Sequence, residues 1–104
     1  MGNTNYFYSI VKILENPIQI QINDEISIIT FRVELFQIRS NCTNQIIFLV
    51  FLGKKISKVK QYCKINNYIL IEGDLSIKEK KSDISSFTTI KSVIVNVSKF
   101  YPIQ

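Results

Sequence analysis

The chain has 104 residues, a length that suits one domain, and its formal net charge at pH 7 is +5. Hydrophobic residues make up 46% of it and charged residues 20%, which excludes a disordered chain and provides enough apolar material for a core. The longest apolar run, Ile46–Leu52, is too short to span a bilayer. The opening residues Met1–Asn5 lack the pattern of a signal peptide. We therefore expect no membrane association.

The positive charge is unevenly distributed. Ten lysines lie in the second half of the chain, where they outnumber the acidic residues. A basic half favours an anionic partner such as nucleic acid. A solvated surface that keeps the protein soluble would explain the same charges equally well.

Few residues offer catalytic chemistry. The sequence has no His, which removes the usual nucleophile–base pairs and the commonest zinc ligand, and it has no Gly-rich phosphate loop. Cys42 and Cys63 form no CxxC pair, and we expect a loop thiol and a buried helix thiol. Glu72 and Asp74 share one strand face, where a role at the rim is more plausible than an acid–base pair. We expect no enzymatic activity, no metal and no cofactor.

The first half of the chain predicts strands. Tyr6–Leu14 is rich in aromatic and β-branched residues, and Pro17 follows it. Residues Ile18–Ile22 alternate strictly, as in a half-buried strand or ribbon. Residues Ile26–Ile38 alternate again and end in a polar loop over 39–44. Gln45–Leu52 is apolar on both faces, which predicts a strand that is buried on both sides or lines a binding surface.

The second half begins with a change of period. Lys54–Ile65 carries apolar residues at helical spacing, which predicts an amphipathic helix of about three turns, and Asn66 can adopt the left-handed conformation that ends a helix. Tyr68–Ile77 is predicted as a strand, Lys78–Ser86 as a lysine-rich hairpin loop and Phe87–Val97 as the last strand.

This order, with one helix between the third and fourth main strands, predicts an all-β fold: a five-stranded OB-fold Greek-key barrel. An SH3-like barrel is the alternative, but a long helix at this position argues against it. We expect a single OB domain over residues 5–100, with short terminal extensions at 1–4 and 101–104.

Three segments resemble the core of the bacterial single-stranded-DNA-binding proteins. They are Phe48–Lys54, Val59–Lys64 and Tyr68–Leu75, and the resemblance covers about Asn5 to Phe100. The most specific matches are the Gly53-Lys54 pair and Glu72-Gly73-x-Leu75, at the spacing seen in the family. Because Ile, Asn and Lys share AT-rich codons, the composition favours a plastid-encoded relative, with a cytoplasmic protein as the alternative.

The sequence departs from the family in two ways. The resemblance implies a DNA face with stacking Trp residues, but this sequence has no Trp, and Ile38, Ile46 and Lys80 stand at the aligned positions. The family's tail with an acidic tip is also missing, so the resemblance implies a tail-less member.

Single strands are held by basic grooves and stacking rings, so the candidate site combines both kinds of side chain. The candidate nucleic-acid-binding residues are Arg32, Phe36, Phe48, Lys54, Lys78, Lys80 and Lys81. Phe36 and Phe48 could equally pack in the core or in an oligomer interface. The cluster Lys78–Lys81 could be a solvated loop, and the remaining helix lysines are expected to form a plain solvent face.

Two functions are compatible with these patterns. The first is non-sequence-specific binding of single-stranded DNA, and possibly RNA, in DNA replication or maintenance. The second is an OB interaction module of a replication or translation assembly that has lost strong DNA binding. We also expect a homodimer or homotetramer, because the strands are apolar on more than one face.

Overall fold

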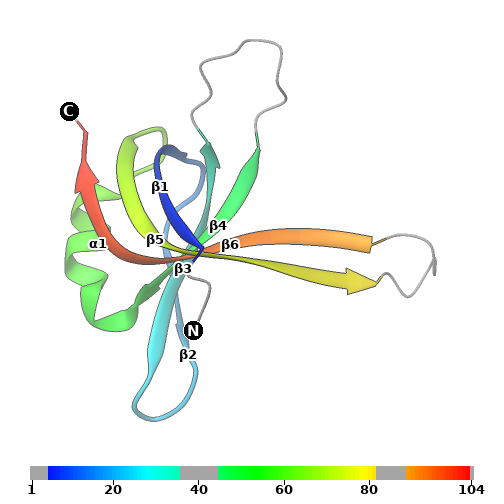
Figure 1. The fold of residues 1–104 in the computed structure, drawn as a ribbon. Coiled ribbons are helices and arrows are strands. Elements are labelled where there is room, and N and C mark those ends of the chain that lie inside the picture. The colour runs from blue at the N-terminus through cyan, green and yellow to red at the C-terminus, as the bar shows by residue number, and fades with distance from the viewer. Residues whose placement is uncertain (1–4, 36–44, 82–88, 104) are drawn as a thin grey trace.

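The computed structural model describes residues 5–35, 45–81 and 89–103, of which 79–81 and 89–91 are described by their backbone only. The elements of this part are β1 (Tyr6–Ile13), β2 (Ile18–Gln21), β3 (Ser27–Leu35), β4 (Ile46–Leu52), the 3₁₀ turn η1 (Gly53–Lys55), α1 (Ile56–Tyr62), β5 (Tyr68–Lys81) and β6 (Thr89–Pro102). Figure 1 shows the curved strands with α1 on one side.

The strands close into a barrel. Their order in the sheet is β1-β5-β6-β4-β3-β2. An additional pairing of β1 with β3 closes these strands into a barrel, and β2 lies outside the closure. Among the described strands, β4 and β6 run parallel and the other pairs are antiparallel. This topology, with α1 between β4 and β5, confirms the predicted OB-fold. The sixth strand is β2, which pairs with β3 and is exposed along its whole length, so of the two possibilities expected here, a half-buried strand or a ribbon, the structure has the ribbon.

Strict alternation along β3 and β4 builds the core. Phe31 and Val33 of β3 are buried, and so are Ile47, Leu49 and Phe51 of β4. The rings of Phe31 and Phe51 are stacked, with their centroids 5.6 Å apart. Every second residue of β4 is instead at least partly exposed, which decides between the two possibilities for this strand: one face is buried and the other is open.

The helix is shorter than predicted. The segment starts with the 3₁₀ turn over Gly53–Lys55, and the α-helical part ends at Tyr62. Its buried side chain is Val59, followed by Cys63 just beyond the end. Asn66 has a φ of 74°, so the predicted left-handed residue is confirmed. In the described part of the chain, no helix has the length and apolar character needed to cross a membrane.

Strands β5 and β6 are longer than predicted. They pair as far as Lys81 and Thr89, and beyond the barrel they form the two-stranded arm that projects to the right in Figure 1. The loop predicted over Lys78–Ser86 is therefore wrong for Lys78–Lys81, which belong to β5; residues 82–88 lie outside the described part. A ribbon with solvent on both faces needs no apolar alternation, so the pattern could not reveal it. At its other end β6 includes Tyr101 and Pro102, which were expected in a terminal extension.

Two glycines stand where backbones approach closely. A Cβ on Gly73 would lie 2.1 Å from the carbonyl oxygen of Asn96 in the neighbouring β6, and a Cβ on Gly53 would lie 1.8 Å from the Ser27 Oγ. The pairing of β5 with β6 shifts by one residue next to Gly73, so the glycine allows a β-bulge at this point.

Candidate nucleic-acid interface

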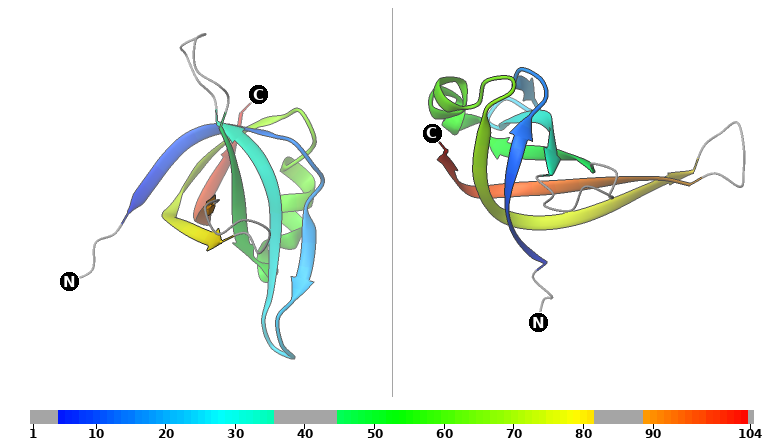
Figure 2. Two further views of the ribbon diagram at one scale, coloured as in Figure 1. Left: turned by 90° about the vertical axis from the view of Figure 1, so that its right-hand side faces the viewer. Right: turned by 90° about the horizontal axis from the view of Figure 1, so that it is seen from above.

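One row of side chains crosses four strands on the open face of the sheet. Arg32 of β3 is the direct partner of Phe48 in β4, Phe48 is paired with Ile94 of β6, and Ile94 is paired with Ser76 of β5. Figure 2 shows the strands that carry this row from two further sides. Two of the predicted site residues, Arg32 and Phe48, are thus brought together as cross-strand neighbours.

An apolar lane runs along β4 through this row. Ile46, Phe48 and Leu52 are 49%, 37% and 51% exposed, respectively, which is unusual for apolar side chains in the middle of a sheet. Phe48 is therefore outside the core, and one of the possibilities considered for it, core packing, is wrong. An exposed ring at this place can stack on a base or pack in an interface.

Arg32 is partly neutralised within the chain. Its guanidinium forms an ion pair with Glu15 at 3.2 Å, and both side chains remain partly exposed. Glu15 precedes β2 and was not among the predicted site residues, because nothing in the sequence indicates that the turn after β1 returns to β3. The guanidinium keeps free N–H groups that can donate to another oxygen.

Lys78 extends the row toward the arm. It follows Ser76 by two residues in β5, so it lies on the same face, and it is exposed. The backbones of Lys80 and Lys81 continue this strand, while their side chains and all of Phe36 lie outside the described part. The structure therefore groups Arg32, Phe48 and Lys78 on one surface, which we call the sheet face.

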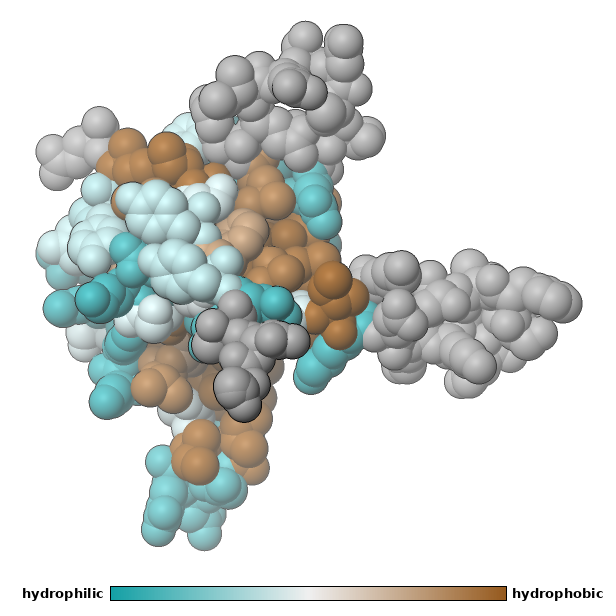
Figure 3. All heavy atoms as spheres, viewed as in Figure 1, coloured by the Kyte–Doolittle hydropathy of each residue, from teal (hydrophilic) through white to brown (hydrophobic). Residues whose placement is uncertain are grey.

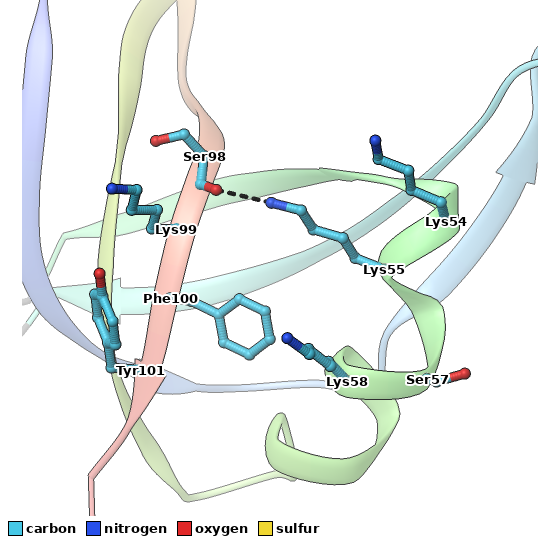
Figure 4. Close-up of a pocket in the computed structure, with 8 residues that line it drawn as sticks. All are labelled: Lys54, Lys55, Ser57, Lys58, Ser98, Lys99, Phe100 and Tyr101. Atoms are coloured by element: carbon cyan, nitrogen blue, oxygen red, sulfur yellow. Dashed lines mark hydrogen bonds between the residues drawn. The ribbon is translucent and has the colours of Figure 1, made fainter.

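Lys54 lies apart from these residues. It stands in η1 and lines a pocket of about 580 Å³ between the helix and the end of β6. Figure 4 shows the residues around this pocket, including three further lysines: Lys55 and Lys58, which were predicted to form a plain solvent face, and Lys99. The lining consists of Lys54, Lys55, Ser57, Lys58, Ser98, Lys99, Phe100 and Tyr101.

The acidic and thiol groups considered as candidates for chemistry are explained by their structural environment. Desolvation, followed by a hydrogen bond to Glu72, raises the pKa of Tyr6, so the Glu72 carboxylate already has a partner at the rim. Burial raises the pKa of the Cys63 thiol to about 12, which keeps it protonated and unreactive, as expected for a buried helix thiol. Cys42 lies outside the described part. Among the described residues, no three Cys, Asp or Glu side chains are grouped as metal ligands.

The chain is similar to a curated protein over nearly its whole length. No family model matches the chain. The "Putative single-stranded DNA-binding protein ycf41" of Trieres chinensis is 32% identical over 99 residues, which covers 94% of this chain and 88% of that protein. The chain belongs to the single-stranded-DNA-binding protein family. The predicted resemblance is thereby confirmed.

Solved structures of this family share the fold. The small single-stranded-DNA-binding protein of Streptomyces coelicolor superposes with a TM-score of 0.82 at 6% identity, covering 98% of this chain and 96% of that one. The second single-stranded-DNA-binding protein of Mycobacterium smegmatis gives a TM-score of 0.69 at 18% identity, covering 96% and 89%. At such identities the likeness shows the fold alone.

The two motifs that indicated this family have a physical basis. Gly53 lets the chain turn from β4 into η1 directly over Ser27, and Gly73 lets β5 pass close to the backbone of β6. These glycines shape the barrel next to the sheet face and next to the pocket. In this member of the single-stranded-DNA-binding family the two glycine motifs therefore determine the path of the backbone. Contacts with a ligand depend on the side chains of the neighbouring residues.

Proposed function

We propose that the protein binds single-stranded DNA without sequence specificity. The observation that carries this proposal is the adjacency of Arg32 and Phe48 on an exposed sheet face. A cation beside an exposed ring can hold a phosphate while a base stacks on the ring, and every base offers a face for stacking. Family membership supports the same function.

The arm adds positive charge to this surface. Lys78 lies on the sheet face, and the strand continues through Lys80 and Lys81. Lysine ammonium groups act as point charges that bind the phosphates of a DNA strand. Such contacts do not distinguish one base from another. We therefore assign Lys78, Lys80 and Lys81 to the backbone of the DNA, together with Arg32, and assign Phe48 to the bases.

The decisive experiment is a titration of labelled oligo-dT, followed by fluorescence anisotropy at several salt concentrations. The variant K78A/K80A/K81A should bind more weakly, and the slope of log Kobs against log[salt] should fall by about 0.7 for each phosphate contact removed. The same affinity for oligo-dA and oligo-dT would support a lack of specificity, and oligo-U would measure any binding of RNA. No binding by the parent protein at low salt would overturn the proposal.

A second candidate is a protein-interaction module in a replication or translation assembly. The exposed side chains of Ile46 and Leu52 favour it, since neither offers a ring for stacking. This function becomes the better one if oligonucleotides fail to bind while the sheet face proves to be covered in a complex. Under the first candidate, the role is DNA replication or maintenance.

We infer further that the protein acts as a homodimer or homotetramer. In the described part of the chain, Tyr6–Ile10 of β1 are paired with β5 alone, and the pairing of β1 with β3 begins at Val11. Tyr6 and Tyr8 are 63% and 57% exposed there, and Figure 3 shows side chains of intermediate and high hydropathy over this part of the molecule. A strand with an open edge and exposed rings can pair with a second copy.

We also propose a plastid location and no catalytic activity. The location is supported by the AT-rich codon preference of the residues used, and immunolocalisation in intact cells would test it. The absence of enzymatic function is supported by membership of a DNA-binding family. A hydrolase or nuclease activity that disappears in a Glu72→Gln variant would contradict it.

A further inference from the structure

A cluster of four lysines surrounds the pocket between α1 and the end of β6. Lys54, Lys55 and Lys58 approach from the helical segment, and Lys99 approaches from the strand. The lining contains no carboxylate. The one ion pair found among the described residues joins Arg32 to Glu15 elsewhere in the molecule, so these ammonium groups have no acidic partner in that part of the chain.

The bulge in β6 builds one wall of this pocket. Glu72 is paired with Lys99 and Gly73 with Val97, which leaves Ser98 as the extra residue. The Ser98 hydroxyl donates to the Glu72 carbonyl oxygen at 3.1 Å, and the Ser98 carbonyl oxygen accepts the Lys55 Nζ at 2.7 Å. Lys55 is therefore tied across the pocket, as the dashed line in Figure 4 shows, while three lysines stay available to a ligand.

The same bulge brings two rings to the pocket. After the shift in register, Phe100 turns toward the core, where its ring meets that of Phe51 edge-on at 5.3 Å. Tyr101 points the other way and is 44% exposed. The pocket, at about 580 Å³, has the size of a small-molecule site. It combines cations with aromatic surface, which is the chemistry that binds nucleotides.

The pocket begins where the apolar lane of β4 ends. Leu52 is the last residue of that lane, and Lys54 follows it after the turn at Gly53. A strand of DNA lying along β4 would thus be led to the first lysine of the pocket.

We propose that this pocket is a second nucleic-acid subsite, which binds backbone phosphates of the same single strand as it leaves the sheet face. This inference rests on the proposed function. Lys54, Lys58 and Lys99 hold the phosphates, and Lys55 holds the pocket open through Ser98. Tyr101 offers its ring to a base at the mouth.

The test compares two double variants that lose equal charge. K58A/K99A removes two lysines of the pocket. K60A/K64A removes two exposed lysines that do not line it, one in α1 and one just beyond its end. Lys55 is kept, because its hydrogen bond supports the fold. Binding of labelled oligo-dT is followed by anisotropy over a range of salt concentrations, and circular dichroism verifies that both variants are folded.

For K58A/K99A we expect the slope of log Kobs against log[salt] to fall by about 1.4, which is two contacts at about 0.7 each. The control should retain the parental slope. If both double variants behave alike while F48A loses affinity, the pocket inference is wrong and the proposed function stands. If the parent protein binds no oligo-dT at all, the proposed function fails as well.

Discussion

Glu15 binds Arg32 through both of its carboxylate oxygens: Oε2 accepts the backbone N–H of Arg32 at 2.7 Å, and Oε1 accepts the guanidinium at 3.2 Å. The acid therefore anchors the turn after β1 to the middle of β3 and at the same time neutralises a cation of the sheet face. A DNA phosphate would have to share this guanidinium with Glu15.

The first prediction concerns this competition. Replacing Glu15 by Gln keeps an acceptor for the backbone N–H and removes the negative charge, so Arg32 becomes fully available to phosphate. We expect tighter binding of oligo-dT at low salt and a steeper salt dependence. Stability should fall by at most about 1 kcal/mol, since the pair is exposed. Glu25→Gln, which removes the same charge in an exposed turn, should change neither quantity, and equal effects of the two variants would contradict the prediction.

The second prediction concerns acid stability. Hydrogen bonding to Arg32 lowers the pKa of Glu15 below its ordinary value of 4.5. The folded state thus prefers the ionised carboxylate, and this stabilisation is complete above pH 4.5 and is lost as the pH falls through the lower pKa of the folded protein. Urea unfolding between pH 7 and pH 3 should show a smaller loss of stability for Glu15→Gln than for the parent. Identical pH profiles would exclude this contribution.

The third prediction concerns the ring of Phe48. If it stacks on a base, Phe48→Ala should weaken binding of oligo-dT by about 1–3 kcal/mol and leave the salt slope nearly unchanged, because stacking involves no counterions. Tyr62 on α1 is equally exposed, at 37%, and provides the matched control. A variant that binds normally but sediments as a smaller species would instead place Phe48 in a subunit interface.

The fourth prediction concerns Gly73. The added methyl group of Gly73→Ala would overlap the carbonyl oxygen of Asn96, which belongs to the backbone and cannot turn aside. We expect a loss of stability of about 1–3 kcal/mol, as for other overpacked sites. The exposed neighbour Asp74 provides the control Asp74→Ala. Thermal unfolding measures both variants, and equal midpoints would show that the sheet adjusts to the extra atom.

The fifth prediction concerns assembly. Tyr8→Arg introduces a charge among the exposed rings of β1, where a second copy is proposed to pair. Sedimentation equilibrium should then show a lower mass than that of the parent protein. The same replacement at Tyr62 should leave the mass unchanged. A parent protein that is monomeric at micromolar concentration would remove the proposal of an oligomer.

Local patterns predicted the barrel well. The alternation of Phe31 and Val33 around Arg32 fixes which face of β3 is buried, and the apolar spacing of Val59 and Cys63 fixes the inner side of the helix. Arg32 and Phe48 were predicted as site residues one by one. Their adjacency depends on the register between two strands, and sequence periodicity decides which face each residue takes but not which residues of the two strands are paired.

The features that were missed depend on long-range geometry. The pocket exists because a bulge at Ser98 reverses which residues of β6 face outward, and no local signal marks this reversal. The arm was predicted as a loop because Lys78–Lys81 lack apolar alternation, although a solvated ribbon does not need it. The position of Glu15 beside Arg32 likewise arises from a turn whose path only the folded structure shows.

The closure of the barrel has a consequence for how the chain folds during synthesis. The first strand made, β1, is paired with β5, and its residue Tyr6 meets Asp74. Its apolar residues Val11 and Ile13 therefore stay partly exposed to solvent until most of the chain has left the ribosome, whereas β3 and β4 can pair early. Distant pairing of this kind slows folding. The barrel can therefore close only after β5 has been made.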